Sequence, residues 1–414
     1  MRILLITDNF VPETNSPARR AYEHARLWVR GGNKVTVITS IPNFPTGKPL
    51  PPYQNRLWQR EEMDGIEVVR VWTLLAPNSG IVLRSFDFLS FAMSSFLAGL
   101  FEHADVIVAS SPQLLTGMAG WWLSGMKRCP WLLEIRDLWP DSIVAVGAMR
   151  ENFYVRALRI LERHLYKSAS RIVAVSDGLR DRIVGYGTPP EKIGVVPNGV
   201  EPDRLRLRPK NGPLMQQLQL NDKFVVGYVG THGMAQGLEV VLHAAELLAA
   251  SRACFLFVGE GARRKHIMAA AAEMKLTNVR FVGLVPSDLA TDHLALCDIV
   301  LIPLRRSSQL EITIPSKIFE AAAMERPMIV GAEGASAKLV QHYEAGLVVP
   351  PEDPEALAAA ISRLQSDAAL HARLREGCRA LARDFDRQAM AAAMLDEMRI
   401  AMSRQAEVPV TSSG

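Results

Sequence analysis

The chain has 414 residues, more than one hydrophobic core usually supports, so its length favours two domains of about 200 residues each. Hydrophobic residues make up 49% of the sequence and charged residues 22%, a composition typical of a soluble globular protein with a generous core. The formal charge of +4 gives no reason to expect a dedicated nucleic-acid binder.

The cysteines and the N-terminal residues narrow the class of protein further. Cys129, Cys254, Cys297 and Cys378 are far apart in apolar surroundings, so local spacing builds neither a zinc knuckle nor a redox pair. We therefore expect no metal site, and reduced core thiols in a cytoplasmic protein. The opening MRILLITDNF is too short for a signal peptide, and no segment approaches the ~20 uninterrupted apolar residues of a membrane span.

Short β-rich runs alternate with helical or loop segments along the whole chain. The first series is RILLIT, KVTVIT, IEVVRV, DVIVASS, WLLEIR and RIVAVS. The second is FVVGYVG, CFLFVGEG, VRFVGLV, DIVLIPL, PMIVGAE and GLVVPPE. This alternation predicts an α/β protein with two doubly wound domains, each a parallel sheet covered on both faces.

Domain limits follow from the segment 201–222, which lacks a strand and carries proline and charge. We expect an N-terminal domain at 1–205, a linker at 206–222 and a C-terminal domain at 223–390. A terminal helix at 391–407 could cross back to the N-terminal domain. The tail at 408–414 is expected to be disordered.

The segment 86–101, FDFLSFAMSSFLAGLF, carries five aromatic residues and one charge. Two interpretations stay open: a buried crossover helix, which the core preference of Phe and Leu favours, and a membrane-surface helix. Trp121 and Trp122, followed by Lys127 and Arg128, form a second candidate for a membrane surface that is equally open.

Ligands of open α/β sheets bind beyond the carboxyl ends of the strands, so we expect the site in the loops that follow the predicted strands. After the first strand, a helix start near 15–17 offers backbone N–H groups to an anion, although ordinary turns use the same residues. After WLLEIR, Arg136 and Asp137 leave a strand end, either as functional groups or as a buried ion pair that orients the loop.

The first loop of the second domain places Gly230, Gly233 and Gly237 between a strand and an amphipathic helix, so that backbone can approach a pyrophosphate. Their spacing fits a dinucleotide loop only loosely. The next strand is followed by Arg264 and Lys265, which would suit phosphate but are also typical surface charges.

The segment PSKIFEAAAMERPMIV predicts a short helix capped by Ser316, with Lys317 and Glu320 on one face. Phosphate is favoured at a helix N-terminus, and an ionised carboxylate accepts hydrogen bonds from a ribose diol. We infer a nucleotide whose phosphates and sugar lie across this helix start. The alternative is an amphipathic helix with a surface ion pair.

Nine pieces, in order, resemble the retaining GT-B glycosyltransferases of family four: IRDLWPDS, ASRIVAVSDGL, VVPNGV, GYVGTHGMAQGLE, FVGEG, NVRFVGLVP, DIVLIPL, PSKIFEAAAMERPMI and GLVVPPEDPEALAAAI. The resemblance covers roughly 1–390. It is greatest to the branch acting in bacterial O-antigen, capsule and exopolysaccharide assembly, including N-acetylfucosaminyl transferases. SIPNFPTGK, SFAMSSF and RDLWPDS carry that part.

The resemblance implies two Rossmann-like domains facing a central cleft, and transfer of a sugar from a UDP-sugar with retention of configuration and without a metal or other cofactor. It points to an N-acetylated or 6-deoxy hexosamine, an undecaprenyl-diphosphate-linked saccharide as acceptor, and the cytoplasmic face of the membrane. It assigns catalysis to Arg136, Asp137, Lys317 and Glu320. We expect donor binding by Asn15, Ser16, Gly230, Gly233, Gln236, Gly237, Leu284, Val285, Pro286, Ser316, Lys317 and Glu320. Arg264 and Lys265 are added as substitutes for cations that the family has in the glycine loop and this sequence lacks there.

Several positions depart from the family pattern. Thr231 and Gln236 stand where many members have Arg and Lys, and Ile312 replaces the first glutamate of a pair that Glu320 completes. Asn15-Ser16 replaces two glycines, and the His often found before Asp137 is an arginine. Two alternatives therefore remain: a UDP-sugar 2-epimerase, which would need acid–base carboxylates around the sugar, and a catalytically inactive homologue.

Overall fold

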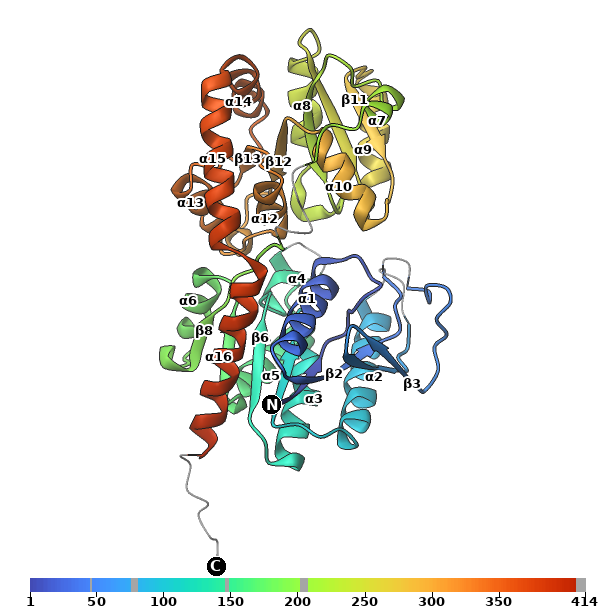
Figure 1. Cartoon of the computed structure of the whole chain (residues 1–414), viewed down its shortest axis with the longest axis vertical. Helices are drawn as coiled ribbons and strands as arrows, with labels where there is room; N and C mark the ends of the chain where they lie inside the picture. The colour runs from blue at the N-terminus through green and yellow to red at the C-terminus, as the bar shows by residue number, and fades with distance from the viewer. Residues whose placement is uncertain (45–46, 76–80, 146–148, 202–207, 407–414) are drawn as a thin grey trace, which may run out of the picture. The chain divides into compact units, whose positions relative to one another are not determined.

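The computed structural model describes residues 1–44, 47–75, 81–145, 149–201 and 208–406. They divide into two compact units (Figure 1): Met1–Pro197 together with the segment from Arg387 onward, and Asn198–Asp386. Each unit contains one predominantly parallel sheet with helices around it. The predicted α/β class with two Rossmann-like sheets is confirmed.

The first unit has a sheet in which all neighbouring strands are parallel except β3 and β4. Its strands run from edge to edge in the order β3 (Trp58–Met63), β4 (Ile66–Val71), β2 (Lys34–Ser40), β1 (Arg2–Ile6), β5 (Val106–Ser110), β6 (Trp131–Ile135), β7 (Arg171–Ala174) and β8 (Ile193–Val195). β5, β6 and β7 are buried throughout, which explains their nearly continuous apolar sequences. Because β2 and β5 flank β1 on opposite sides, the direction of winding reverses beside β1.

Helices cover both faces of this sheet. They are α1 (Ser16–Arg30), α2 (Ile81–Leu100), α3 (Leu114–Lys127), α4 (Asp141–Ala145), α5 (Phe153–Ser168), α6 (Asp177–Gly185) and α16 (Arg387–Ala406). Val108 and Leu132 pack in one core with α1 and α16, whereas Leu133 contacts α3 at Gly117. Successive strand residues face opposite sides, so α1 and α16 cover one face and α3 covers the other.

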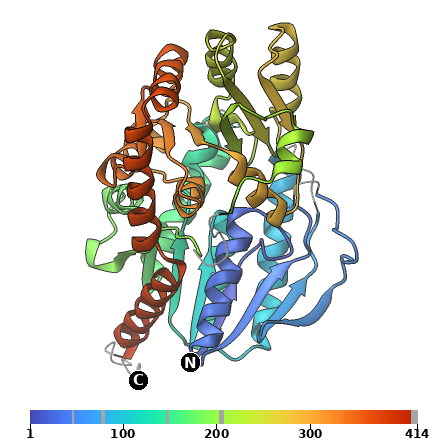
Figure 2. The same cartoon turned by 45° about the horizontal axis from the view of Figure 1, so that its top comes forward.

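The C-terminal helix α16 lies beside α1 (Figure 2) and completes the first unit. Trp28 Nε1 donates a hydrogen bond to the carbonyl oxygen of Ala391 over 2.9 Å. Arg387 forms a buried ion pair with Glu23 at 2.7 Å.

The second unit has an all-parallel sheet of six strands. Their order is β11 (Val279–Val282), β10 (Ala253–Val258), β9 (Phe224–Val229), β12 (Ile299–Pro303), β13 (Met328–Gly331) and β14 (Gly346–Val349). The first strand in sequence, β9, again lies where the winding reverses, which is the usual ligand site of such sheets.

The helices of the second unit enclose two hydrophobic cores. They are α7 (Gly212–Gln217), α8 (Glu239–Leu247), α9 (Arg264–Glu273), α10 (Ser287–Leu296), α11 (Ser308–Glu311), α12 (Ser316–Ala323), α13 (Ala335–His342), α14 (Pro354–Ser366) and α15 (Ala368–Asp384).

The limits of the units differ from the limits expected from the sequence. The chain passes to the second unit after Pro197 and returns at Arg387, whereas the sequence placed a linker at 206–222 and the second domain's end at 390. Residues 208–222 contain α7 and the buried Leu220, which packs in a core of the second unit. The first two residues of the proposed linker and the tail 408–414 lie outside the described residues.

Candidate functional site

Two closely packed glycines, Gly230 and Gly259, lie at the carboxyl ends of β9 and β10, and we call them the glycine layer. Gly230 and Gly259 both have left-handed φ angles, +136° and +132°. A Cβ atom on Gly259 would lie 2.2 Å from the carbonyl oxygen of Gly230. His232 N donates to the carbonyl oxygen of Glu260 over 2.8 Å, so the loops after the two strands are hydrogen-bonded to each other. Glycine here allows a close approach of backbone that any side chain would prevent.

Lys317 reaches this layer from the first turn of α12. Its Nζ donates to the hydroxyl of Tyr228 and lies 3.9 Å from the centre of that ring. A Cβ atom on Gly230 would lie 2.4 Å from Lys317 Cε, so glycine at position 230 leaves room for the lysine. Burial lowers the pKa of Lys317 to about 7, and Glu320 opposes this shift. The ammonium forms no ion pair with any described residue, so an incoming anion would restore its charge.

His232 is a further candidate that the sequence analysis did not select. It is completely buried, and its ring centre lies 5.5 Å from that of Tyr228. Neither ring nitrogen has a hydrogen-bond partner among the described residues. Burial, together with the charges of Lys317 and Arg264, lowers the pKa of His232 to about 4, so the ring is neutral at pH 7. The signal available in the sequence was a histidine between two glycines in a strand-end loop.

Gln236 closes the glycine loop on itself. Its Oε1 accepts a hydrogen bond from Gly233 N over 3.0 Å. Gly237 follows with a left-handed φ of +52°, and a Cβ atom there would lie 3.0 Å from Arg305 Cγ. Arg305, which the sequence analysis did not select, also donates its backbone N–H to Ala235 over 2.9 Å. It therefore brings a cation to the part of the loop where position 236 lacks one.

The two cations proposed on α9 are in different surroundings. Arg264 pairs with Glu260, Nε to Oε1 at 3.3 Å, beside the glycine layer. Lys265 is exposed on α9. Arg263, just before the helix, forms an ion pair with Glu239. Of the two predicted residues, only Arg264 contacts a residue of the loop after β10.

The start of α12 differs in detail from the prediction. Pro315 is the N-cap and Ser316 is the first helical residue, so the predicted serine cap is wrong. No side chain caps the helix, which leaves its first N–H groups available to an anion. Lys317 and Glu320 do follow each other by three residues on α12, as predicted. The segment proposed for the base lies after β11: Leu284 is 59% exposed, Val285 packs on a core, and Pro286 precedes α10.

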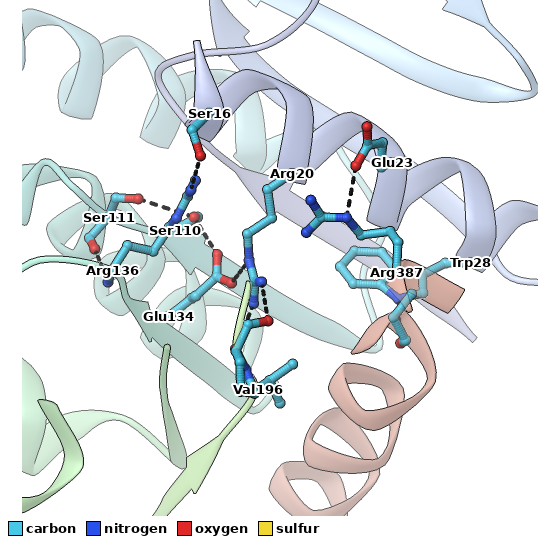
Figure 3. Close-up of polar contacts among 12 residues, drawn as sticks. Ser16, Arg20, Glu23, Trp28, Ser110, Ser111, Glu134, Arg136, Val196 and Arg387 are labelled. Carbon is cyan, nitrogen blue, oxygen red and sulfur yellow. Dashed lines mark hydrogen bonds and ion pairs between the residues drawn. The ribbon is translucent and has the colours of Figure 1, made fainter. Parts of the chain in front are cut away.

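Two candidates of the first unit, Ser16 and Arg136, lie near the buried carboxylate of Glu134 (Figure 3). Glu134, at the end of β6, accepts hydrogen bonds from Arg20 Nε over 2.8 Å and from the hydroxyl of Ser110. The other Arg20 nitrogens donate to the carbonyl oxygens of Pro197 and Val196, at 2.6 and 3.0 Å. Arg20 is 1% exposed, so this network fixes α1 to the sheet.

Arg136 lies beside that network. Its backbone N–H donates to Ser111 Oγ over 2.7 Å, and its Nη2 lies 3.4 Å from Ser16 Oγ. Burial lowers the pKa of Arg136 to about 9, although the nearby Glu134 opposes the shift. Burial also raises the pKa of Asp137. Arg136 and Asp137 form no ion pair with each other. The alternative interpretation of these two residues, a buried ion pair that orients the loop, is therefore wrong.

Asn15 has a structural partner already. Its Oδ1 accepts from Ala18 N over 2.9 Å, which makes it the N-cap of α1. Glu13, which the sequence analysis did not select, binds the loop together: Oε1 accepts from the backbone N–H groups of Asn43 and Phe44, at 2.8 and 2.9 Å. These two backbone partners lie 30 and 31 positions away in sequence, so no local pattern could have indicated them.

Asp8 is a second unselected carboxyl, just after β1 where the winding reverses. Gln113 Nε2 donates to its Oδ2. Burial, together with the negative charges of Asp87 and Glu13, raises the pKa of Asp8 to about 8. The described residues hold no group of three or more His, Cys, Asp or Glu side chains that could bind a metal ion.

Two family models match the chain. Residues 16–199 match the model described as "Glycosyl transferase 4-like domain", and residues 223–367 match "Glycosyl transferases group 1". The two matches fall on the two units separately.

Three similar proteins are named as glycosyltransferases. The probable glycosyltransferase WbjE of Pseudomonas aeruginosa is 26% identical over 67% of this chain and 70% of its own length. The putative colanic acid biosynthesis glycosyl transferase WcaI of Escherichia coli K12 is 26% identical over 87% of this chain and 91% of its own. The amylovoran biosynthesis glycosyltransferase AmsK of Erwinia amylovora is 27% identical over 50% of this chain and 51% of its own. None of these names supports the epimerase alternative.

Solved structures show the same fold. Sucrose-phosphate synthase of Thermosynechococcus elongatus superposes with a TM-score of 0.78 at 20% identity, over 97% of this chain and 99% of that one. HepE of Anabaena, in complex with UDP-glucose, superposes with a TM-score of 0.72 at 18% identity, over 96% and 99%. Since the two family models together match most of both units, the chain belongs to the family-four glycosyltransferases of the GT-B fold, with relatives named for colanic acid and amylovoran biosynthesis.

Proposed function

We propose that this glycosyltransferase moves a sugar from a UDP-sugar to a lipid-linked saccharide, with retention of configuration, in the assembly of a surface polysaccharide. The observation that carries the donor half is the unpaired ammonium of Lys317, set between the open N-terminus of α12 and the glycine layer. A desolvated cation beside free backbone N–H groups is well suited to a diphosphate. HepE, which has the same fold, was solved with UDP and UDP-glucose, which supports a uridine donor.

The donor would extend along the carboxyl ends of the strands. Its diphosphate would meet Lys317 and the loop of Gly233, Gln236 and Gly237. Its ribose would reach Glu320, one turn along the same face of α12. Leu284 and its neighbours would contact the base.

The proposed chemistry needs no metal. Breaking the bond between the anomeric carbon and the diphosphate builds negative charge on the leaving oxygen, and Lys317 with the helix N–H groups would stabilise it. Among the carboxylates of this site, Glu239 and Glu260 are engaged with arginines, and Glu320 is assigned to the ribose. This supports attack by the acceptor on the face that the leaving group vacates, with a diphosphate oxygen taking the acceptor proton, over a double displacement through an enzyme carboxylate.

The acceptor half rests on the first unit. Arg136 and Asp137 are proposed to position the acceptor or the sugar hydroxyls. The acceptor would enter near them and near Asn15 and Ser16, which are also proposed as donor contacts. By family resemblance the sugar is an N-acetylated or 6-deoxy hexosamine. By the same resemblance the acceptor is an undecaprenyl-diphosphate-linked saccharide, met at the cytoplasmic face of the membrane.

The test is calorimetric titration with UDP, GDP and NAD, without added metal. Wild type and Glu273→Ala, a change at an exposed glutamate of α9, should bind UDP with micromolar affinity. Glu320→Ala should lose that binding, because the ribose loses its carboxylate. Binding of none of the three nucleotides by wild type would favour an inactive homologue, for which the altered positions Thr231 and Gln236 are the support.

A further inference from the structure

Helix α2 has two unlike faces. Phe91, Ala92, Ser95 and Ala98 are fully buried, so one face belongs to the core of the first unit. The opposite face exposes apolar side chains every three or four residues: Leu83, Phe86, Leu89, Met93 and Leu97, followed by Phe101, with exposed fractions between 40% and 72%. From 83 to 101, Arg84 is the one described residue that is both exposed and polar. The interpretation as a buried helix is confirmed for the inner face, and the exposed face keeps the membrane-surface interpretation open as a prediction.

Helix α5 continues this exposed apolar surface. Phe153 and Ile160 are 86% and 71% exposed. Arg156, Arg163 and Lys167 are also exposed, and their spacing of three to four residues puts them on the same side of the helix as the two apolar residues.

The two helices are linked through α3 and through their own N-terminal turns. Tyr154 Oη donates to Ser85 Oγ over 2.9 Å. Trp122 of α3 contacts Phe96, and the adjacent Trp121 contacts His164 of α5, at ring-centre distances of 5.6 and 4.4 Å. We call the exposed residues of α2 and α5, with Phe101, the outer apolar surface.

The charges on the two helices indicate the partner of this surface. Glu151, an exposed carboxylate just before α5, is paired with Arg159. The described exposed residues of α2 and α5 include four cations and no carboxylate, since Asp87 is half-buried and Glu162 is buried. A second copy meeting the same surface across a two-fold axis would bring like charges together. An anionic bilayer instead accepts apolar side chains at the acyl boundary and cations among its headgroups.

The inner face of α2 packs in the core of the first unit, so the proposed membrane contact uses only its exposed face. In the described ranges no helix is both long and apolar enough to span a membrane. We propose that the outer apolar surface docks the chain in the plane of an anionic membrane. Its purpose, presentation of a lipid-linked acceptor, rests on the proposed function, but the docking itself does not depend on a donor or acceptor.

The experiment is co-sedimentation with vesicles of phosphatidylcholine, alone or mixed with phosphatidylglycerol. Wild type should sediment with the mixed vesicles, and less so as salt rises. The triple variant Phe86→Ser/Met93→Ser/Leu97→Ser should partition at least ~10-fold less, because it removes apolar area from the interface. Leu247→Ser, at a 58% exposed leucine of the second unit, is the matched control and should sediment as wild type does.

A charge variant separates the two contributions. Each cation near an anionic surface is worth roughly fivefold in partitioning, so Arg156→Gln/Arg163→Gln/Lys167→Gln should lose on the order of 100-fold. Its matched control is Lys338→Gln, at an exposed lysine of α13.

Three results would overturn the proposal: no sedimentation of wild type with mixed vesicles, unchanged sedimentation of both triple variants, or a wild-type dimer that the serine variant converts to monomer. UDP titration of each variant is the independent readout. If wild type binds the mixed vesicles but does not bind UDP, the proposed function is contradicted and the docking surface is still supported.

Discussion

Raising the pH above neutrality should weaken UDP binding through one side chain, Lys317. Burial holds its pKa at about 7 in the free protein, well below the ordinary value of 10.5. A diphosphate beside Nζ favours the charged form, so the pKa rises when the ligand binds. Above pH 7 binding must therefore take up a proton, and the apparent affinity falls as that proton becomes scarcer.

The size of the effect follows from the fraction of Lys317 that is charged before binding. With a pKa of about 7, about half of the molecules are charged at pH 7 and roughly one in eleven at about pH 8, so the dissociation constant should rise ~5-fold between these two pH values. Between pH 7 and about pH 9 the rise should approach ~50-fold. The terminal phosphate of UDP ionises near pH 6, so this range tests the protein rather than the ligand. Proton uptake at about pH 8 should approach ~0.9 per UDP bound.

Calorimetry in two buffers of different ionisation enthalpy measures both quantities. Lys317→Arg keeps its charge throughout this range and should show a flat profile, which separates Lys317 from groups such as Asp8. Lys317→Met should bind weakly at every pH, also with a flat profile. A wild-type dissociation constant that stays constant within about twofold from pH 7 to 9 would refute the reasoning, because it would mean that no buried ammonium is charged by the ligand.

Three further predictions concern stability. Gly259→Ala should lower the free energy of unfolding by about 2 kcal/mol or more in urea titrations, since its φ is left-handed and the new Cβ would lie 2.2 Å from a carbonyl oxygen. The control Gly125→Ala, inside α3 with open space around it, should raise the free energy of unfolding by about 0.5 kcal/mol. Equal effects of the two substitutions would contradict the steric argument. Arg20→Met should cost about 3 kcal/mol because it leaves the Glu134 carboxylate buried without its closest cation, and Arg20→Met/Glu134→Gln should recover part of that loss; a neutral single variant would show that the pair carries no net stability. The pKa of Asp8 is raised to about 8, so the folded state holds a proton that the unfolded state releases, and stability should fall as pH rises from about 4 to 8. Asp8→Asn should flatten that slope and be more stable than wild type by about 1–3 kcal/mol above pH 8; parallel stability curves would show that the carboxyl does not titrate there.

The two sheets could be predicted because buried parallel strands appear as short apolar runs, and each run needs only its own residues to be visible. The position of Lys317 and Glu320 on one helix face could also be predicted from the sequence, because it depends on a helical spacing of three residues. Local patterns of this kind placed the lysine at the right helix start. They could not show that its chain passes over Gly230 to Tyr228, a residue 89 positions away.

Contacts between distant segments account for what was missed. Arg20 and Glu134 are 114 positions apart, and neither stands out in its own strand or helix. The junction of the units was misplaced because α7 lies in a proline-rich, charged segment but still packs on a core through Leu220. On α2, apolar residues cover both faces, so hydrophobic periodicity could not separate the face that meets the core from the face that meets solvent.

Each unit holds a buried or partly buried cation near the carboxyl ends of its strands, but the charge has different partners in the two units. In the first unit Arg20 is neutralised by Glu134 and by backbone carbonyl oxygens, so its charge is already satisfied and its position is structural. In the second unit Lys317 is desolvated and has a neutral phenol as its hydrogen-bond partner. An ammonium that is partly removed from water and has no anionic partner is disfavoured, so the pKa of Lys317 falls to about 7, and an anion that binds beside it favours the charged form again. The contrast is the physical reason for assigning the leaving diphosphate to Lys317 and the support of the sheet to Arg20.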